Sequence, residues 1–84
     1  MGASNLIKYM NRKVLLSKTI GGKVRLDSLE NGEHFFLDVY GGVIGKIVSV
    51  GLNTSVKWLN HPEKPISRVE WIASGTQVKR YNHE

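Results

Sequence analysis

The chain of 84 residues contains no cysteine and only two prolines. The absence of cysteine excludes disulfides and thiolate metal sites, and it is typical of a reducing compartment. No window of about 18 apolar residues occurs, so the sequence predicts no membrane-spanning helix. The first residues also lack the apolar stretch of a signal peptide. We therefore expect a cytoplasmic protein that has no membrane partner.

Residue types that carry catalysis or bind metals are few and scattered. The three histidines, His34, His61 and His83, have no metal-ligand spacing, and structural zinc usually needs four nitrogen or sulfur ligands. No G-x-S-x-G motif marks a nucleophile. The acidic residues do not form a pair suited to general acid–base catalysis. The sequence predicts a protein that is not an enzyme and has no metal site and no cofactor.

The stretch Val39–Gly51, VYGGVIGKIVSVG, combines several glycines with a lysine and raises the question of a phosphate-binding loop. Such a loop requires a strand, a glycine turn and then a helix whose N-terminus faces the phosphate. Here the glycines are followed by a β-branched run, and no Gly-Lys-Ser/Thr triplet occurs. The stretch therefore predicts a β-hairpin with a two-residue turn at Gly41-Gly42.

Short β-type segments recur along the chain and are separated by turn residues. The predicted strands are Lys23–Leu26, Glu33–Tyr40, Val43–Val50, Thr54–Leu59, Ile66–Ile72 and Thr76–Tyr81. Their short, regular spacing is typical of an antiparallel sandwich or barrel. The stretch Ile20-Gly21-Gly22-Lys23 predicts a turn. Trp71 alternates with its neighbours as a buried strand residue does, so we expect it in the core, with a stacking platform on the surface as the alternative.

The N-terminal part of the chain is basic. The net charge is +5, and the cationic residues before the first acid, Asp27, are Lys8, Arg12, Lys13, Lys18, Lys23 and Arg25. This asymmetry indicates a basic arm or face that meets an anionic partner, with a solubilising surface as the alternative. Residues 5–16 predict a short helix capped by Ser4 or Asn5. The alternative is a disordered arm that leads into a strand at residues 13–17.

The predicted hairpin turn sets a strand register, in which Leu37 lies opposite Lys46. One face would then be the core, with Lys46 as its misfit; its apolar members are Phe35, Leu37, Val39, Ile44, Val48, Val50, Val56 and Trp58. The outer face would carry His34, Phe36, Asp38, Tyr40, Val43, Gly45, Ile47 and Lys57. This mixture of aromatic and basic groups is typical of surfaces that bind single-stranded nucleic acid. Alternatively, its aromatic residues lie beneath the N-terminal segment as a second apolar layer.

Two stretches resemble known small barrels. Residues 26–37, LDSLENGEHFFL, resemble the opening of SH3-like barrels, in which a Leu-x-x-Gly-Glu-x-Phe pattern leads into a strand. Residues 39–50 resemble the KOW motif of transcription and ribosomal proteins. The matching residues are Gly42, Gly45, Lys46, Ile47 and Val50, whereas Val43-Ile44 stand where the motif usually has a Lys-Gly step. The resemblance implies an SH3-like barrel that binds RNA, DNA or a ribonucleoprotein through loops and an adjoining strand face.

These features predict an all-β protein, a small SH3-like antiparallel barrel of five or six strands at residues 23–84. A basic N-terminal segment, residues 1–22, precedes the barrel. We expect a non-catalytic module that binds RNA or DNA, or a ribonucleoprotein. The predicted phosphate contacts are Lys8, Arg12, Lys13, Lys46, Lys57, Lys79 and Arg80, and the predicted stacking residues are Phe36, Tyr40 and Tyr81. The alternative is a small adaptor or inhibitor that docks an acidic host protein, as the compact layout resembles bacteriophage accessory proteins.

Overall fold

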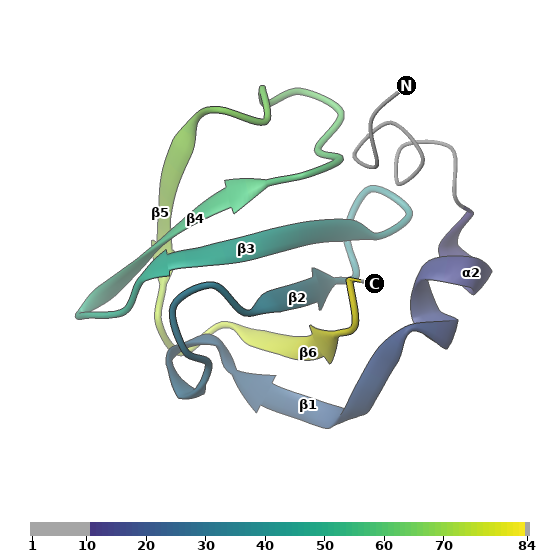
Figure 1. Cartoon of the computed structure of the whole chain (residues 1–84), viewed down its shortest axis with the longest axis horizontal. Coiled ribbons are helices and arrows are strands. Elements are labelled where there is room, and N and C mark those ends of the chain that lie inside the picture. Colours follow the sequence, from purple (N-terminus) through teal and green to yellow (C-terminus); the bar gives the residue numbers. More distant parts are fainter. Residues whose placement is uncertain (1–10, 84) are drawn as a thin grey trace.

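The computed structural model describes residues 11–83, and these form a small β-protein with one short α-helix (Figure 1). The elements are α2 (Arg12–Ser17), β1 (Thr19–Arg25), the 3-10 helix η1 (Leu26–Ser28), β2 (His34–Leu37), β3 (Val43–Ser49), β4 (Asn53–Trp58), β5 (Val69–Ala73) and β6 (Gln77–Tyr81). The predicted all-β class and six strands are confirmed. The predicted caps Ser4 and Asn5 and the predicted contact Lys8 lie outside the described residues.

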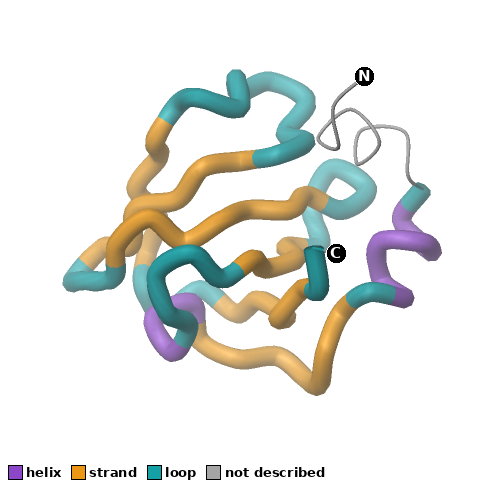
Figure 2. The backbone as a smooth tube through the Cα atoms, viewed as in Figure 1, coloured by secondary structure: helices purple, strands orange, loops and turns teal. Residues whose placement is uncertain are grey.

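The strands form one antiparallel sheet in the order β1-β6-β2-β3-β4-β5. The sheet curls strongly, so that β5 runs across the direction of β1 and β6 (Figure 1, Figure 2). η1 is hydrogen-bonded to the turn between β5 and β6. The Leu26 N–H donates to the Thr76 carbonyl, and the Asp27 N–H donates to the Ser74 carbonyl. The curled sheet is barrel-like, with a concave face around a core and a convex outer face.

The concave face holds the main core. Its buried members are Leu26, Leu29, Phe35, Val43, Ile47, Val56, Trp58 and Val78. Phe35 and Trp58 meet edge to face, with ring centroids 5.7 Å apart. Gly45 lies beneath the Phe35 ring, where an added Cβ would overlap the ring atoms. The packing of Phe35 therefore requires glycine at this point of β3.

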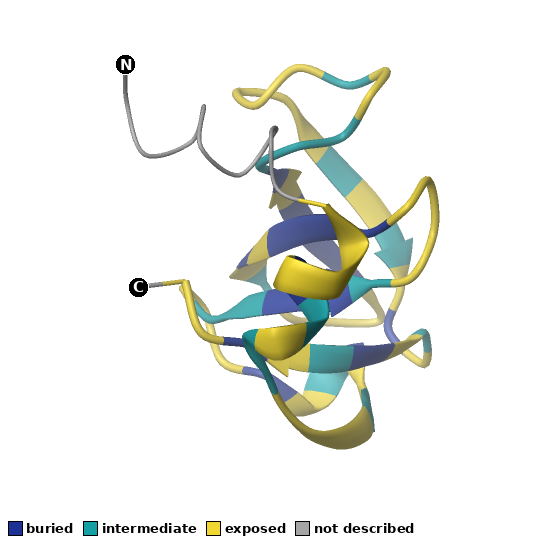
Figure 3. Ribbon diagram, turned by 90° about the vertical axis from the view of Figure 1, so that its right-hand side faces the viewer, coloured by how far each residue is buried: buried dark blue, intermediate teal, exposed yellow. Residues whose placement is uncertain are grey.

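A second apolar layer lies on the convex face, beneath α2. Leu15 packs with Phe36, Ile44 and Tyr81, and Leu16 and Leu59 complete the cluster. Figure 3 shows α2 lying over buried strand residues, with its exposed residues facing outward. Asn11 caps the helix by accepting a hydrogen bond from the Val14 N–H. The structure thus confirms for Phe36, and not for Tyr40, the alternative in which the N-terminal segment covers the aromatic residues of the outer face. The strand alternative for residues 13–17 is wrong.

The predicted two-residue turn at Gly41-Gly42 is wrong. Leu37 pairs with Val43 instead of Lys46, and the connection spans residues 38–42. The chain leaves the sheet at Asp38, which Arg12 of α2 holds by a bidentate ion pair. Tyr40, Gly41 and Gly42 then reverse the chain with φ values of 52°, 77° and 109°.

This register change exchanges the two faces of β3, because successive side chains of a strand point to opposite faces. Val43, Gly45 and Ile47, which we predicted outside, are buried, and Lys46 is exposed on the outer surface. The predicted core residues Val39, Val48 and Val50 are exposed as well. The predicted turn at Gly21-Gly22 is also wrong, since these residues lie within β1 at a break in its pairing with β6.

Candidate functional site

A row of side chains crosses the convex face of β2, β3, β4 and β5. His34 pairs with Lys46, Lys46 with Lys57, and Lys57 with Val69. Partners in an antiparallel register project to the same face, so these side chains stand next to one another. Trp71 follows Val69 on the same face of β5. We define the β3–β5 face as Lys46, Lys57, Val69 and Trp71, with His34 at its margin.

The two lysines of the β3–β5 face are exposed and directly opposed. Among residues 11–83 neither lysine has an ion-pair partner, since the acids that form ion pairs bind Arg12, Arg25, Lys64 and Arg68. Like charges placed directly opposite each other destabilise a sheet. The fold therefore gains nothing from this pair of lysines, and an anionic partner would relieve their repulsion.

Trp71 is exposed beside these lysines, with 67% of its surface accessible. The prediction that it belongs to the core is wrong, although its strand does alternate. β5 turns Glu70 and Ile72 inward, opposite Val56 and Thr54, and therefore turns Trp71 outward. Sequence alternation gave the period of the strand without showing which of its faces is buried.

Two histidines border the row at the β2 end. His34 and His83 stack with ring centroids 4.3 Å apart and an interplanar angle of 22°. Burial, together with the nearby charges of His83 and Lys46, lowers the pKa of His34 to about 4. Burial also lowers the pKa of His83, as do Lys18 and Lys46. Both imidazoles are neutral at neutral pH, so the lysines supply the positive charge of this face.

Two of the predicted stacking residues are buried. Phe36 is 2% exposed and Tyr81 is 6% exposed, because α2 packs on both of them. The prediction that their rings lie on an open surface is therefore wrong. Tyr40 is 64% exposed in the loop after β2, where its ring and that of His61 form a T-shaped pair with centroids 5.0 Å apart.

The remaining predicted phosphate contacts do not join the β3–β5 face. Arg12 is paired with Asp38 at 2.9 and 2.7 Å, and Lys13 is exposed on α2. Lys79 lies opposite Phe36 on β6, and the exposed Arg80 lies opposite Phe35. Of the predicted residues, the structure brings Lys46 and Lys57 together on one face and groups Arg12 with Lys79 elsewhere.

Sequence reasoning missed Trp71 and the two stacked histidines. An exposed tryptophan on an edge strand has the same alternating pattern as a buried one. His34 and His83 lie far apart in the chain, and they meet because β2 pairs with β6. Only the strand order places them together.

In residues 11–83 no group of three or more His, Asp or Glu side chains is arranged to hold a metal ion. The only α-helix in this part of the chain is far too short to cross a membrane. The chain shows no significant match to known family models, to characterised proteins or to solved structures. The resemblance to SH3-like and KOW-containing domains stays a prediction.

Proposed function

We propose that this protein is a non-catalytic nucleic-acid-binding module and that the β3–β5 face is its contact surface. One observation carries the proposal: Lys46 and Lys57 lie directly opposite each other beside the exposed ring of Trp71, and neither lysine has an ion-pair partner in the described part of the chain. Lysines on a sheet hold backbone phosphates, and an exposed aromatic ring stacks on a base. The absence of cysteine suits a protein that works in the cytoplasm.

The composition of the face favours single-stranded RNA or DNA over a duplex. Stacking on Trp71 requires a base whose ring face is free, and such bases are found in single strands, loops and ends. Val69 beside Trp71 extends the apolar part of the surface to one side of the lysines. Phosphates would then lie on Lys46 and Lys57 while one base rests on the edge strand.

A fluorescence-anisotropy titration of the full chain tests this proposal, with labelled single-stranded RNA, single-stranded DNA and duplex DNA at two or more salt concentrations. We expect binding that weakens with salt, and preference for the single strands. In the double variant Lys46→Gln/Lys57→Gln, the slope of log affinity against log salt should fall by about 1.4, because each phosphate contact to a single strand releases roughly 0.7 counterion.

The matched control is the double variant Arg25→Gln/Lys64→Gln, which removes the same charge. Both control residues are already paired with acids, Arg25 with Asp27 and Lys64 with Glu70. The control should retain the wild-type slope. Equal losses in the two double variants would mean that only net charge matters and would refute a site at the β3–β5 face.

A protein-binding adaptor or inhibitor, of the kind found among phage accessory proteins, is the second candidate. It is favoured by the apolar residues exposed on or beside the same face, Val48, Val69 and Trp71, and by the unpaired outer edge of β5. Its partner would be an acidic host protein. Absence of nucleic-acid binding at low salt, together with Trp71-dependent capture of an acidic protein, would favour this candidate.

A further inference from the structure

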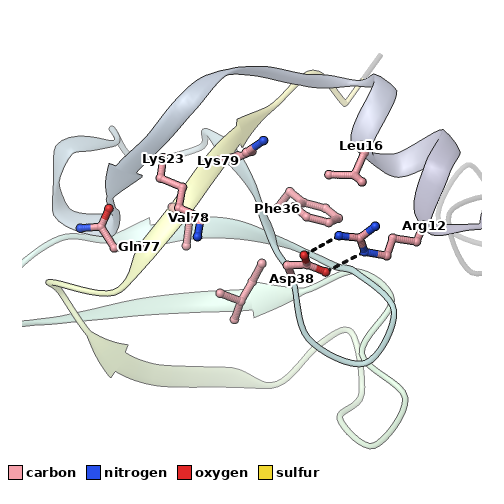
Figure 4. Close-up of a pocket in the computed structure, with 9 residues that line it drawn as sticks. Arg12, Leu16, Lys23, Phe36, Asp38, Gln77, Val78 and Lys79 are labelled. Atoms are coloured by element: carbon pink, nitrogen blue, oxygen red, sulfur yellow. Dashed lines mark hydrogen bonds and ion pairs between the residues drawn. The ribbon is translucent and has the colours of Figure 1, made fainter.

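A second feature of the convex surface is a hollow that α2 helps to line, together with β1, β2 and β6. β2 pairs with β6 only from His34 to Phe36, opposite Tyr81 to Lys79, and beyond this point the two strands part. The gap between them, partly roofed by α2, forms a hollow of about 380 Å³ (Figure 4). This volume is within the range of about 300–1,000 Å³ that is typical of small-molecule sites.

The hollow has an apolar floor and a cationic rim. Leu16, Phe36, Leu37 and Val78 supply apolar lining, and the cationic lining residues are Arg12, Lys23 and Lys79. Lys23 and Lys79 are register partners on β1 and β6, so their side chains stand next to each other. Gln77 adds an amide that can donate or accept a hydrogen bond.

One carboxylate faces these three cations. Asp38 accepts hydrogen bonds from Arg12 at 2.9 and 2.7 Å, and Arg12, followed by Lys23 and Lys79, lowers its pKa. Asp38 is thus bound by Arg12, and within residues 11–83 neither Lys23 nor Lys79 has an ion-pair partner. The lining of the hollow therefore contains two neighbouring lysines that have no ion-pair partner among the described residues, and their only carboxylate neighbour in the lining is bound by Arg12.

We propose that this hollow binds a small organic anion that carries an apolar body and a phosphate or carboxylate group. The apolar body lies against Phe36, Leu16 and Val78, and the anionic group lies between Lys23 and Lys79. Each lysine donates hydrogen bonds to an anionic oxygen, an interaction stronger than a hydrogen bond between neutral groups. The site does not depend on the β3–β5 face, since none of the residues that line the hollow belongs to that face.

The test uses 1-naphthyl phosphate as the probe and two-dimensional NMR of the ¹⁵N-labelled full chain as the readout. We expect saturable shifts at Leu16, at residues 36–38 and at residues 77–79. Neutral 1-naphthol lacks the anionic group, and inorganic phosphate lacks the apolar body, so both should bind at least about tenfold more weakly.

The variant Lys23→Gln/Lys79→Gln should weaken binding of 1-naphthyl phosphate by about tenfold or more. The variant Lys46→Gln/Lys57→Gln removes the same charge from the other surface and should bind as the wild type does. The dispersion of the NMR spectrum shows in each case that the chain is folded. The proposal would be overturned if 1-naphthol bound as tightly as 1-naphthyl phosphate, if the shifts were confined to the β3–β5 face, or if no saturable shift occurred. None of these outcomes bears on the nucleic-acid proposal, which the salt titration tests separately.

Discussion

The two tryptophans lie in opposite environments. Trp58 is 5% exposed and packs edge to face on Phe35 in the main core, whereas Trp71 is 67% exposed on the edge strand. Each tryptophan is inferred to be important for a different reason, Trp58 for stability and Trp71 for binding. Substitution at the two positions separates these roles.

We expect Trp71→Ala to weaken binding of single-stranded nucleic acid by about 5- to 150-fold, since stacking contributes roughly 1–3 kcal/mol per base. Its urea midpoint should remain close to that of the wild type, because the ring is exposed. Quenching of Trp71 fluorescence on binding is a second readout. Unchanged affinity in this variant would refute a stacking role for Trp71.

Gly45 gives a stability prediction at the same scale. A Cβ at this position would overlap the Phe35 ring, and the surrounding core is closely packed. We expect Gly45→Ala to destabilise the fold by about 1–3 kcal/mol through overpacking. Gly51→Ala is the control, as its added Cβ would meet no atom closer than 3.4 Å. Urea unfolding of both variants measures the difference.

Among the elements, α2 is short and contributes through packing more than through helix propensity. Leu15 is 2% exposed, and it covers Phe36, Ile44 and Tyr81 on the convex face. Without this helix the outer surface would expose a continuous apolar patch. α2 therefore completes the second apolar layer, and its residues Arg12 and Leu16 also line the hollow beside Lys23 and Lys79.

We expect Leu15→Ala to lower the free energy of unfolding by about 2–5 kcal/mol, because it removes a buried side chain and leaves a cavity. Val14→Ala on the same helix is the matched control. Val14 is 40% exposed, so its truncation should cost about 1 kcal/mol or less. Denaturation midpoints that are equal in the two variants would show that α2 does not pack as described.

Across the whole molecule, stability should depend on pH through the histidine pair. The pKa of His34 is about 4 in the folded chain, against 6.5 for an ordinary histidine. Above pH 6.5 the side chain is neutral in both states and has no pH-dependent effect. As the pH falls from 6.5 towards 4, the unfolded chain takes up the proton first, and folding stability declines.

Urea unfolding at pH 7.5, 6 and 5 measures this decline. His34→Gln cannot be protonated in this range, so the variant should lose less stability between pH 7.5 and 5 than the wild type does. The carboxylates whose pKa is lowered by ion pairs, Asp27, Asp38 and Glu70, lose their contribution at lower pH. An identical decline in wild type and variant would exclude His34 as its source.

Local sequence is enough to predict the β class of this chain. Six β-type segments follow from alternation, β-branched residues and turn glycines, which depend on neighbouring residues only, whereas the same signals left a helix and a strand both open at residues 13–17. The basic character of the molecule also follows directly from composition. The surface position of Lys46 and Lys57, which we predicted as phosphate contacts, could be anticipated because a charged lysine side chain in a strand is rarely buried.

The tertiary structure alone decided which face of each strand is buried. The register between β2 and β3 follows from the length and turn of the connection at residues 38–42, in which Tyr40, Gly41 and Gly42 have positive φ and Asp38 leaves the sheet beside Arg12. A displacement by an odd number of positions then exchanges inside and outside. The burial of Phe36 and Tyr81 under α2, the exposure of Trp71 and the position of Lys23 opposite Lys79 each depend on tertiary packing or strand pairing, of which local sequence carries no sign.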